Sequence, residues 1–398
     1  MDVPLLFFIA GSIIVVGFLG DLVYDKTKVP DVLMLLGVGI LLGPVFKVVD
    51  HRHLTDFAEY FGTFALIVIL FEGGMDIKIR MLLQEFGNAT ILVAISFIST
   101  TSAITAFLIY VHGWELLPSL MMATVLGCTS AAIVLPVLAK MSVKDETKTV
   151  LYIESAMSDV LAVVLAISLI EFVKLESIGI EKPLQSIASS FSIAIIAGTA
   201  FGLSWYKILN LMGERKYSYM VTLGVMLIVV AVVDFLGGSG PVAVLIFGVI
   251  LGNCGDVTFI QASSSCKLID ETIKFFHGEV TFFIRTFFFV YMGMMVTAEA
   301  LAPGNIAMSL VFVFIIVLMR YLSVEFMIRR SGKGKEEKNV FFYMLPRGLA
   351  TAVLASLPLA AGIENSRDFI VYAVSVIVLT NIVMTAGVLH MERKRLKP

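Results

Sequence analysis

Long apolar runs separated by short polar breaks make up almost the whole chain. The runs at 5–20, 33–46, 91–111 and 306–318 are nearly free of charged residues. An α-helix needs about 20 apolar residues to cross the hydrocarbon core of a bilayer. We therefore predict an all-α membrane protein with about 13 transmembrane helices, near 4–20, 30–46, 57–76, 88–112, 117–139, 148–173, 184–209, 217–235, 239–253, 271–297, 304–328, 338–360 and 367–391.

The composition supports this prediction. Hydrophobic residues make up 59% of the chain and charged residues 15%, whereas a soluble domain is roughly half apolar and about a quarter charged. No polar stretch is long enough for a separate soluble domain, so residues 1–398 are expected to form a single transmembrane domain without a nucleotide-binding domain. We expect no cofactor and no nucleic-acid partner, and the three cysteines do not form a spaced metal motif. The lipid bilayer is the expected surrounding.

Basic residues concentrate in loops on one side of the predicted membrane. With the N-terminus placed outside, 20 of the 29 lysine and arginine residues fall in inner loops and 5 in outer loops. Lysine and arginine are enriched in cytoplasmic loops. We therefore expect a multi-pass protein of the cell (plasma) membrane, with the N-terminus outside, an odd number of crossings and the C-terminus in the cytoplasm.

Two short glycine-containing patterns recur along the chain. Leu36–Gly43 resembles Leu245–Gly252 at an offset of 209 residues, and Gly73–Met75 resembles Met292–Met294 at an offset of 219. These offsets correspond to a shift of seven predicted helices, and an odd shift inverts the topology. Inverted repeats are typical of secondary transporters, whose substrate sites lie near the midplane at discontinuous helices. Accidental similarity between glycine-rich helices is the alternative.

Each repeat contains one helix that is expected to break within the membrane. The fifth segment contains Gly127–Ser130 followed by Pro136, and the twelfth contains Pro346–Gly348. An interior proline removes a helical hydrogen bond and clashes with the preceding turn. Thr129 and Arg347 are 218 residues apart, close to the repeat offset. The two breaks therefore indicate a symmetric site, with simple proline kinks as the alternative.

Ionisable residues deep in a membrane are costly and mark candidate sites. The sixth segment carries Asp159 well inside the predicted bilayer, with Ser155 four residues earlier on the same helical face. Hard cations favour oxygen ligands. We therefore predict a site that binds a proton or a monovalent cation, with Asp159, Ser155 and Thr129 as cation ligands and Ser130 and Ser158 beside them. A structural hydrogen-bonding role for Asp159 is the alternative.

A second carboxylate in the same segment needs a separate partner. Glu154 lies five residues before Asp159, roughly 140° around the helix, and so faces a different neighbour. Because an unpaired buried charge is costly, we expect Glu154 to form a structural ion pair. Arg320 is the preferred partner and Arg347 is placed at the crossing of the broken helices, although the sequence does not decide between the two arginines. Glu72 is an accessory candidate that lines a cytoplasmic funnel or faces the headgroups.

These residues resemble the motifs of the cation:proton antiporter superfamily, in particular the NhaP/NHE-type sodium (or potassium)/proton exchangers. The resemblance covers nearly the whole chain and rests on Phe71–Gly74, Thr129–Ser130, Glu154–Asp159, Arg320 and Pro346–Gly348. It implies an inverted-repeat, NhaA-like antiporter fold with two crossing, partly unwound helices, working as a homodimer by elevator-type alternating access. It also implies a transport bundle near 57–173 and 271–360, a dimerisation part near 1–46 and 184–253, and Asp159 as the ion- and proton-binding carboxylate.

The chain departs from the family pattern at two positions. Many relatives have Asn-Asp where this chain has Ser158–Asp159, and Thr-Asp where it has Thr129–Ser130. The site thus has one carboxylate fewer than expected, which leaves both Na⁺ and K⁺ open as the transported cation.

The predicted function is secondary active antiport of Na⁺ or K⁺ against H⁺, serving pH homeostasis, with the two ions competing for Asp159. One titrating carboxylate predicts electroneutral, one-for-one exchange. A passive cation channel would need a filter of carbonyl or charge rings, and a membrane-embedded enzyme would need a nucleophile–base or metal constellation. Neither pattern is found in the sequence, so we predict a transporter rather than a channel, an enzyme or another kind of membrane protein.

Overall fold

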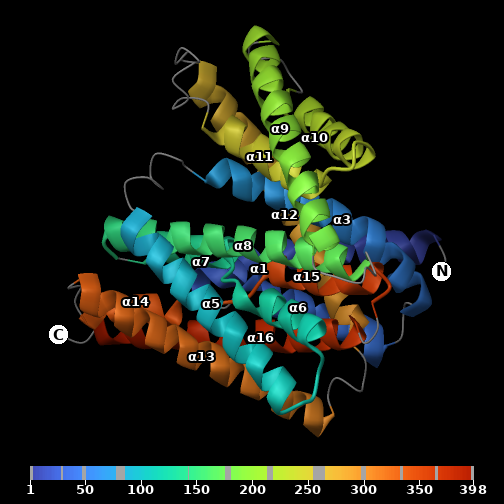
Figure 1. Ribbon diagram of the computed structural model, residues 1–398. Helices are drawn as coiled ribbons and strands as arrows, with labels where there is room; N and C mark the ends of the chain where they lie inside the picture. Colours follow the sequence, from blue (N-terminus) through green and yellow to red (C-terminus); the bar gives the residue numbers. More distant parts are fainter. Residues whose placement is uncertain are drawn as a thin grey trace. The chain divides into compact units, whose positions relative to one another are not determined.

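A computed structural model describes residues 3–27, 30–46, 51–77, 86–141, 143–174, 181–212, 218–253, 265–296, 302–331, 335–363 and 366–395. Every regular element within these ranges is a helix, which confirms the predicted all-α class. The helices (Figure 1) are α1 (Val3–Thr27), α2 (Asp31–Ile40) with a π-helical turn (Leu41–Val45), α3 (His51–Asp76), α5 (Phe86–Tyr110), α6 (Leu116–Gly127), α7 (Ala131–Lys140), α8 (Asp145–Lys174), α9 (Glu181–Met212), α10 (Ser218–Phe235), α11 (Gly240–Gly252), α12 (Ser265–Met295), α13 (Pro303–Ser331), α14 (Lys335–Tyr343), α15 (Leu349–Ala360) and α16 (Ser366–Arg395).

The helices have the length and surface of membrane helices. In the described part of the chain, six are long and apolar enough to cross a membrane. Large apolar side chains also point outward: Ile196 is 72% exposed and Phe314 is 65% exposed. Such side chains are unfavourable in water but are at home against lipid tails. The number of crossings and the orientation stay predictions.

The chain divides into two compact units, and each is described by itself. The first comprises Met1–Thr63, Gly87–Ala166 and Phe283–Pro398, and the second comprises Phe64–Phe86 and Ile167–Phe282. The division into a transport bundle and a dimerisation part, implied by the family resemblance, stays a prediction.

In the second unit, α9, α10 and α11 pack together (green to yellow in Figure 1). The indole N–H of Trp205 on α9 donates a hydrogen bond to the Thr222 hydroxyl on α10 at 3.0 Å. Gly198 lets α9 approach α11, because a Cβ at this position would lie 2.5 Å from the carbonyl oxygen of Ala243. Close approach at small residues is a common way for membrane helices to associate.

Glycines from the two sequence repeats make corresponding helix crossings, one in each unit. In the first unit, a Cβ on Gly39 of α2 would lie 2.8 Å from the Cα of Gly293 on α12. In the second unit, a Cβ on Gly74 of α3 would lie 3.2 Å from the Cα of Gly248 on α11. The recurring patterns found in the sequence therefore pair with one another, since the second helix of one repeat meets the third helix of the other.

The first interrupted helix is the one predicted in the fifth apolar segment. α6 ends at Gly127, Cys128–Ser130 are non-helical, and α7 begins at Ala131. Pro136 lies within α7 and not at the interruption, so the proline is not the cause of this break. The interruption coincides instead with the polar residues that precede α7.

The second interruption lies in the predicted twelfth segment. α14 ends at Tyr343, Met344–Gly348 are non-helical, and α15 begins at Leu349. Pro346 lies inside this interruption, as the sequence predicts, and contributes no N–H group to any helix. Both interruptions belong to the first unit.

Candidate functional site

The two interruptions contact each other directly. The N–H of Ser130 donates a hydrogen bond to the carbonyl of Pro346 at 2.9 Å. Gly348 lies against the Ser130 side chain, and a Cβ on Gly348 would lie 2.7 Å from the Cβ of Ser130. Non-helical backbone at membrane depth needs partners inside the protein or beside water. Each break therefore supplies a hydrogen-bond partner for a main-chain group of the other break that has no partner within its own helix.

Asp159 of α8 lies at the start of α7. Its Oδ2 accepts a hydrogen bond from the N–H of Ala131, the first residue of α7, at 3.2 Å. A helix N-terminus carries partial positive charge, which favours a carboxylate there. The Oδ1 of Asp159 is shielded and has no hydrogen-bond partner among the described residues. One carboxylate oxygen is therefore buried and available to a proton or a cation.

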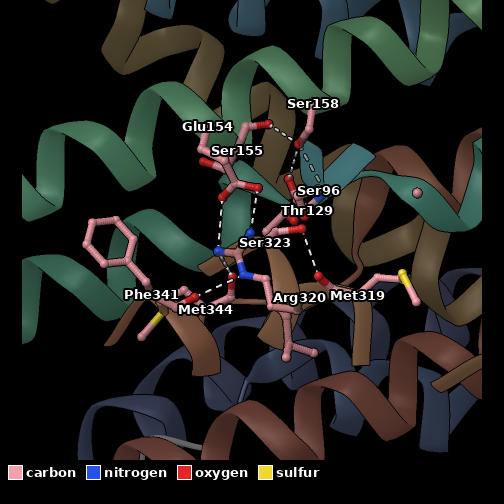
Figure 2. A network of polar contacts seen from close by, with 12 residues as sticks. Ser96, Thr129, Glu154, Ser155, Ser158, Met319, Arg320, Ser323, Phe341 and Met344 are labelled. Atoms are coloured by element: carbon pink, nitrogen blue, oxygen red, sulfur yellow. Dashed lines mark hydrogen bonds and ion pairs between the residues drawn. The ribbon is translucent and has the colours of Figure 1, made fainter. Parts of the chain in front are cut away.

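Ser158 holds the backbone of the first break. Its Oγ accepts a hydrogen bond from the N–H of Thr129 at 3.0 Å and lies within donating distance of two carbonyls, those of Ser155 at 3.0 Å and Thr129 at 3.3 Å. The Ser155 hydroxyl donates to the carbonyl of Tyr152 one turn earlier at 3.0 Å. Figure 2 shows Thr129, Ser155 and Ser158 in one polar network. The predicted ligands thus gather at the break, with the two serine hydroxyls already bonded to main chain.

Glu154 pairs with Arg320 and not with Arg347. Two hydrogen bonds join the Arg320 guanidinium to the Glu154 carboxylate, at 2.8 Å and 3.2 Å. Both side chains are almost wholly buried, at 2% exposure for Arg320 and 1% for Glu154. Removing one partner of such a pair leaves an uncompensated buried charge. Figure 2 shows this pair at the centre of the network.

Arg320 also caps the helix that leads into the second break. Its Nε donates to the carbonyl of Phe341 at 2.9 Å, and its Nη2 donates to the carbonyl of Met344 at 2.7 Å. The last carbonyls of a helix have no partner within the helix and carry partial negative charge. Arg320 therefore joins α13, α14 and the Glu154 carboxylate of α8 in one contact.

Arg347 caps the C-terminal end of α6, the helix that leads into the first break. Its Nε donates to the carbonyl of Leu126 at 2.9 Å, and its Nη2 donates to that of Gly127 at 3.4 Å. These are the last two carbonyls of α6. A guanidinium thus lies at the negative end of α6, while the Asp159 carboxylate lies at the positive end of α7. The broken helix has a complementary charge at each end of the interruption.

Glu72 belongs to the second unit. It lies on α3 and its Oε2 accepts a hydrogen bond from the Thr281 hydroxyl of α12 at 2.6 Å. The accessory role suggested for Glu72 by the sequence stays a prediction.

The structure adds polar residues that the sequence reading passed over. The Sγ of Cys128, in the first break, lies 3.4 Å from the Thr351 hydroxyl of α15. Thr380 and Asn381 of α16 bond to the backbone of Arg347 in the second break. Thr380 and Asn381 could have been found in the sequence as an adjacent polar pair in the middle of an apolar segment. No cluster of three histidine, cysteine, aspartate or glutamate side chains suited to a metal ion occurs within the described ranges.

Two interrupted helices that meet at their breaks beside a carboxylate with a buried oxygen are typical of ion-coupled secondary transporters. A family profile described as "Sodium/hydrogen exchanger, transmembrane" matches residues 11–391. The chain belongs to this family, and it is a multi-pass membrane protein of the cation/proton antiporter class. The resemblance to cation:proton antiporters is confirmed, as is the prediction of a transporter rather than an enzyme.

Relatives named for two different cations match the chain. It is 26% identical over 367 residues to Na(+)/H(+) antiporter 1 of Methanocaldococcus jannaschii, covering 90% of this chain and 83% of that protein. It is also 26% identical over 399 residues to K(+)/H(+) antiporter NhaP2 of Shewanella oneidensis, covering 96% of this chain and 65% of that protein. The solved structure of the sodium proton antiporter MjNhaP1 from M. jannaschii at pH 8 matches with a TM-score of 0.81 at 23% identity, over 100% of both chains. The chain therefore has the fold of that antiporter.

Proposed function

We propose that this protein exchanges a monovalent cation, Na⁺ or K⁺, for H⁺ across the membrane, and that the two ions compete for Asp159. The observation that carries the proposal is the buried, unpartnered Oδ1 of Asp159 beside the meeting point of two broken helices. A buried carboxylate oxygen without a partner is costly unless an ion occupies it. Membership of the sodium/hydrogen exchanger family supports the same function.

The proposed cation ligands are the Asp159 carboxylate, Ser155 and Thr129, with Ser130 and Ser158 shaping the break around them. Ser158 fixes Thr129 by hydrogen bonds to both its N–H and its carbonyl. When a proton or a cation neutralises Asp159, the site can pass the apolar barrier. A bare carboxylate is costly in that barrier, which discourages return of the empty site and couples the two fluxes.

Exchange is proposed to be electroneutral. Glu154, the carboxylate five residues before Asp159 on α8, is held in its buried pair with Arg320. Asp159 then carries either one proton or one monovalent cation in each half-cycle. Equal charge in both directions gives one-for-one exchange.

The remaining features follow the family resemblance. We propose a homodimer in the plasma membrane, with the N-terminus outside and the C-terminus in the cytoplasm, and a role in pH homeostasis. The transport bundle, near 57–173 and 271–360, would carry Asp159 between the two sides by an elevator-type movement against the dimerisation part, near 1–46 and 184–253.

The cation is the open part of the proposal. Many relatives have asparagine where this chain has Ser158 and aspartate where it has Ser130. The named relatives include both a Na⁺ and a K⁺ antiporter. We therefore propose a single monovalent cation from this pair and leave the choice to the assay.

The test is reconstitution into proteoliposomes with an imposed pH gradient and a pH-sensitive dye inside. Addition of Na⁺ or K⁺ to wild-type vesicles should dissipate the gradient, and Asp159→Asn vesicles should match protein-free vesicles. No cation-dependent change with either ion would overturn the proposal. Cation movement that is independent of the proton gradient would indicate a passive channel instead.

A further inference from the structure

The backbone of Arg347, in the second break, is held on both sides by α16. The N–H of Arg347 donates to the Thr380 hydroxyl at 3.1 Å, and the Asn381 side-chain amide donates to the Arg347 carbonyl at 2.9 Å. Thr380 and Asn381 are both 0% exposed, and Arg347 is 3% exposed. Water therefore cannot replace either bond without entering the core.

The first break is held in a corresponding way. There, Ser158 of α8 accepts from the N–H of Thr129 and is placed to donate to its carbonyl. Thr129 and Arg347 are 218 residues apart, close to the repeat offset of 219, so they occupy corresponding positions in the two breaks. α8 and α16 are the long helices near the two breaks that supply these side chains. In each repeat, a side chain from a continuous helix thus fixes the central peptide of the interrupted one.

Fixing the Arg347 peptide also fixes its guanidinium. The guanidinium bonds to the last carbonyls of α6, and the adjoining Pro346 carbonyl accepts from the N–H of Ser130. A shift of the Arg347 backbone would therefore move the positive charge and disturb the first break. The Asp159 carboxylate accepts a hydrogen bond from the N–H of Ala131, the residue after Ser130 and the first of α7.

We propose that Thr380 and Asn381 are positioning residues for ion exchange, which hold the second break in the geometry that the cation site requires. This inference rests on the proposed function and adds to it two residues that touch neither Asp159 nor its predicted ligands in any contact described above. Their action runs through the Arg347 peptide, the crossing at Ser130 and Pro346, and then the start of α7.

Thr380 has a matched control on its own helix. The hydroxyls of Thr380 and Thr385 both donate to the carbonyl four residues earlier, at 2.7 Å and 2.8 Å, and both side chains are buried. Thr380 in addition accepts from the N–H of Arg347. Thr380→Val and Thr385→Val therefore make the same chemical change, and only the first removes a partner from the break. Thr380→Ser retains the accepting oxygen.

The first readout does not depend on transport. Hydrogen–deuterium exchange, followed by mass spectrometry on the protein in nanodiscs, reports on the peptide that contains 344–348. We expect deuterium uptake there to rise in Thr380→Val and to stay at the wild-type level in Thr385→Val and Thr380→Ser. Equal uptake in Thr380→Val and Thr385→Val would overturn the assignment of Thr380, whether or not the protein exchanges ions.

The second readout separates positioning from simple loss of folded protein. We expect the KM for the cation in proteoliposomes to rise about tenfold in Thr380→Val, the effect of one unmatched buried N–H. A merely structural defect would lower the maximal rate through loss of active protein and leave KM unchanged. An unchanged KM in Thr380→Val, or an equal rise in Thr385→Val, would overturn the proposal.

Asn381 is tested by two variants of similar size. Asn381→Leu removes the amide, and Asn381→Asp keeps the oxygen but cannot donate to the Arg347 carbonyl when ionised. Both are expected to raise KM, and wild-type KM in both would overturn the role of Asn381. Wild-type vesicles in the same series distinguish the two proposals. Absence of exchange by the wild type counts against the proposed function. Exchange by the wild type with an unchanged KM in the variants counts against the positioning role of Thr380 and Asn381.

Discussion

Gly348 and Ser130 touch where the two interrupted helices meet, and the distance between them leaves no room for a Cβ on residue 348. The added carbon would overlap the Ser130 hydroxyl, so one of the two backbones would have to move. The hydrogen bond from the N–H of Ser130 to the Pro346 carbonyl lies in the same crossing. This contact makes the spacing of the two breaks sensitive to a single methyl group.

Gly348→Ala is therefore expected to reduce exchange at least about fivefold, because overpacking of a tight contact costs roughly 1–3 kcal/mol. The measurement is the initial rate of cation-driven proton flux in proteoliposomes, normalised to folded protein. Gly224→Ala on α10 is the control, since a Cβ there meets nothing within 4 Å. Wild-type flux in Gly348→Ala would show that the crossing tolerates expansion and that its spacing does not matter.

Asp159→Asn should abolish exchange and leave a folded protein. Asparagine has nearly the same shape but cannot take up and release a proton. Its amide can occupy the place beside the N-terminus of α7, so thermal stability should stay close to that of the wild type. Flux assays and a thermal-unfolding assay on the same preparation check both parts. Retained cation-coupled proton flux would remove Asp159 from the mechanism.

Glu154→Ala should lower the stability of the protein through the loss of the buried ion pair. The change strands the Arg320 guanidinium in the core, at a cost of roughly 3–5 kcal/mol. A double variant that removes both Glu154 and Arg320 should recover part of the loss, and the matched double variant with Arg347 should not. Recovery is expected to be partial, because Arg320 also caps the carbonyls of Phe341 and Met344. A stable but inactive Glu154→Ala would instead place Glu154 in the ion site.

Exchange should not respond to membrane voltage. A potential of 100 mV does about 2.3 kcal/mol of work on each net charge moved, so an electrogenic exchanger would respond measurably. The check is to balance the cation and proton gradients in proteoliposomes and then impose a voltage with an ion that the protein does not carry. Net flux that follows the sign of the voltage would reveal a second titrating group, and Glu72 would be the first residue to replace.

The sequence predicts the helical class, the two interrupted segments and the carboxylates from local features. Apolar length indicates the helices, and proline, glycine and polar residues in mid-segment indicate the breaks. Pro346 does lie in its break, but Pro136 lies within α7, because the polar run Cys128–Ser130 finds partners in α8 and in the other break. A helix is interrupted where its backbone finds other partners, and a proline alone does not decide this.

The partners of the two arginines depend on distant main-chain carbonyls. Arg320 and Arg347 are both single cations within apolar segments, and the sequence offers Glu154 to either of them. The choice is made by the helix ends, since α14 ends beside Arg320 and α6 ends beside Arg347. The role of Thr380 and Asn381 was not predicted for a related reason. Within an apolar helix, a threonine or asparagine side chain can form a hydrogen bond to a carbonyl of the preceding turn and then needs no partner on another helix. Their contact with the Arg347 peptide is visible only once the fold brings α16 beside the break.

The glycine crossings bear on how such a protein could move. Gly39 and Gly293 belong to the proposed dimerisation part and transport bundle respectively, and Gly248 and Gly74 repeat this arrangement in the other unit. At these glycines main chain lies directly against main chain, with no side chain between the two helices at the point of contact. Two such crossings would guide the direction in which one helix slides past the other, without side chains that interlock at the point of contact. A bulky residue at any of these four glycines would then lower the rate of the sliding step, even though the glycine lies far along the chain from Asp159.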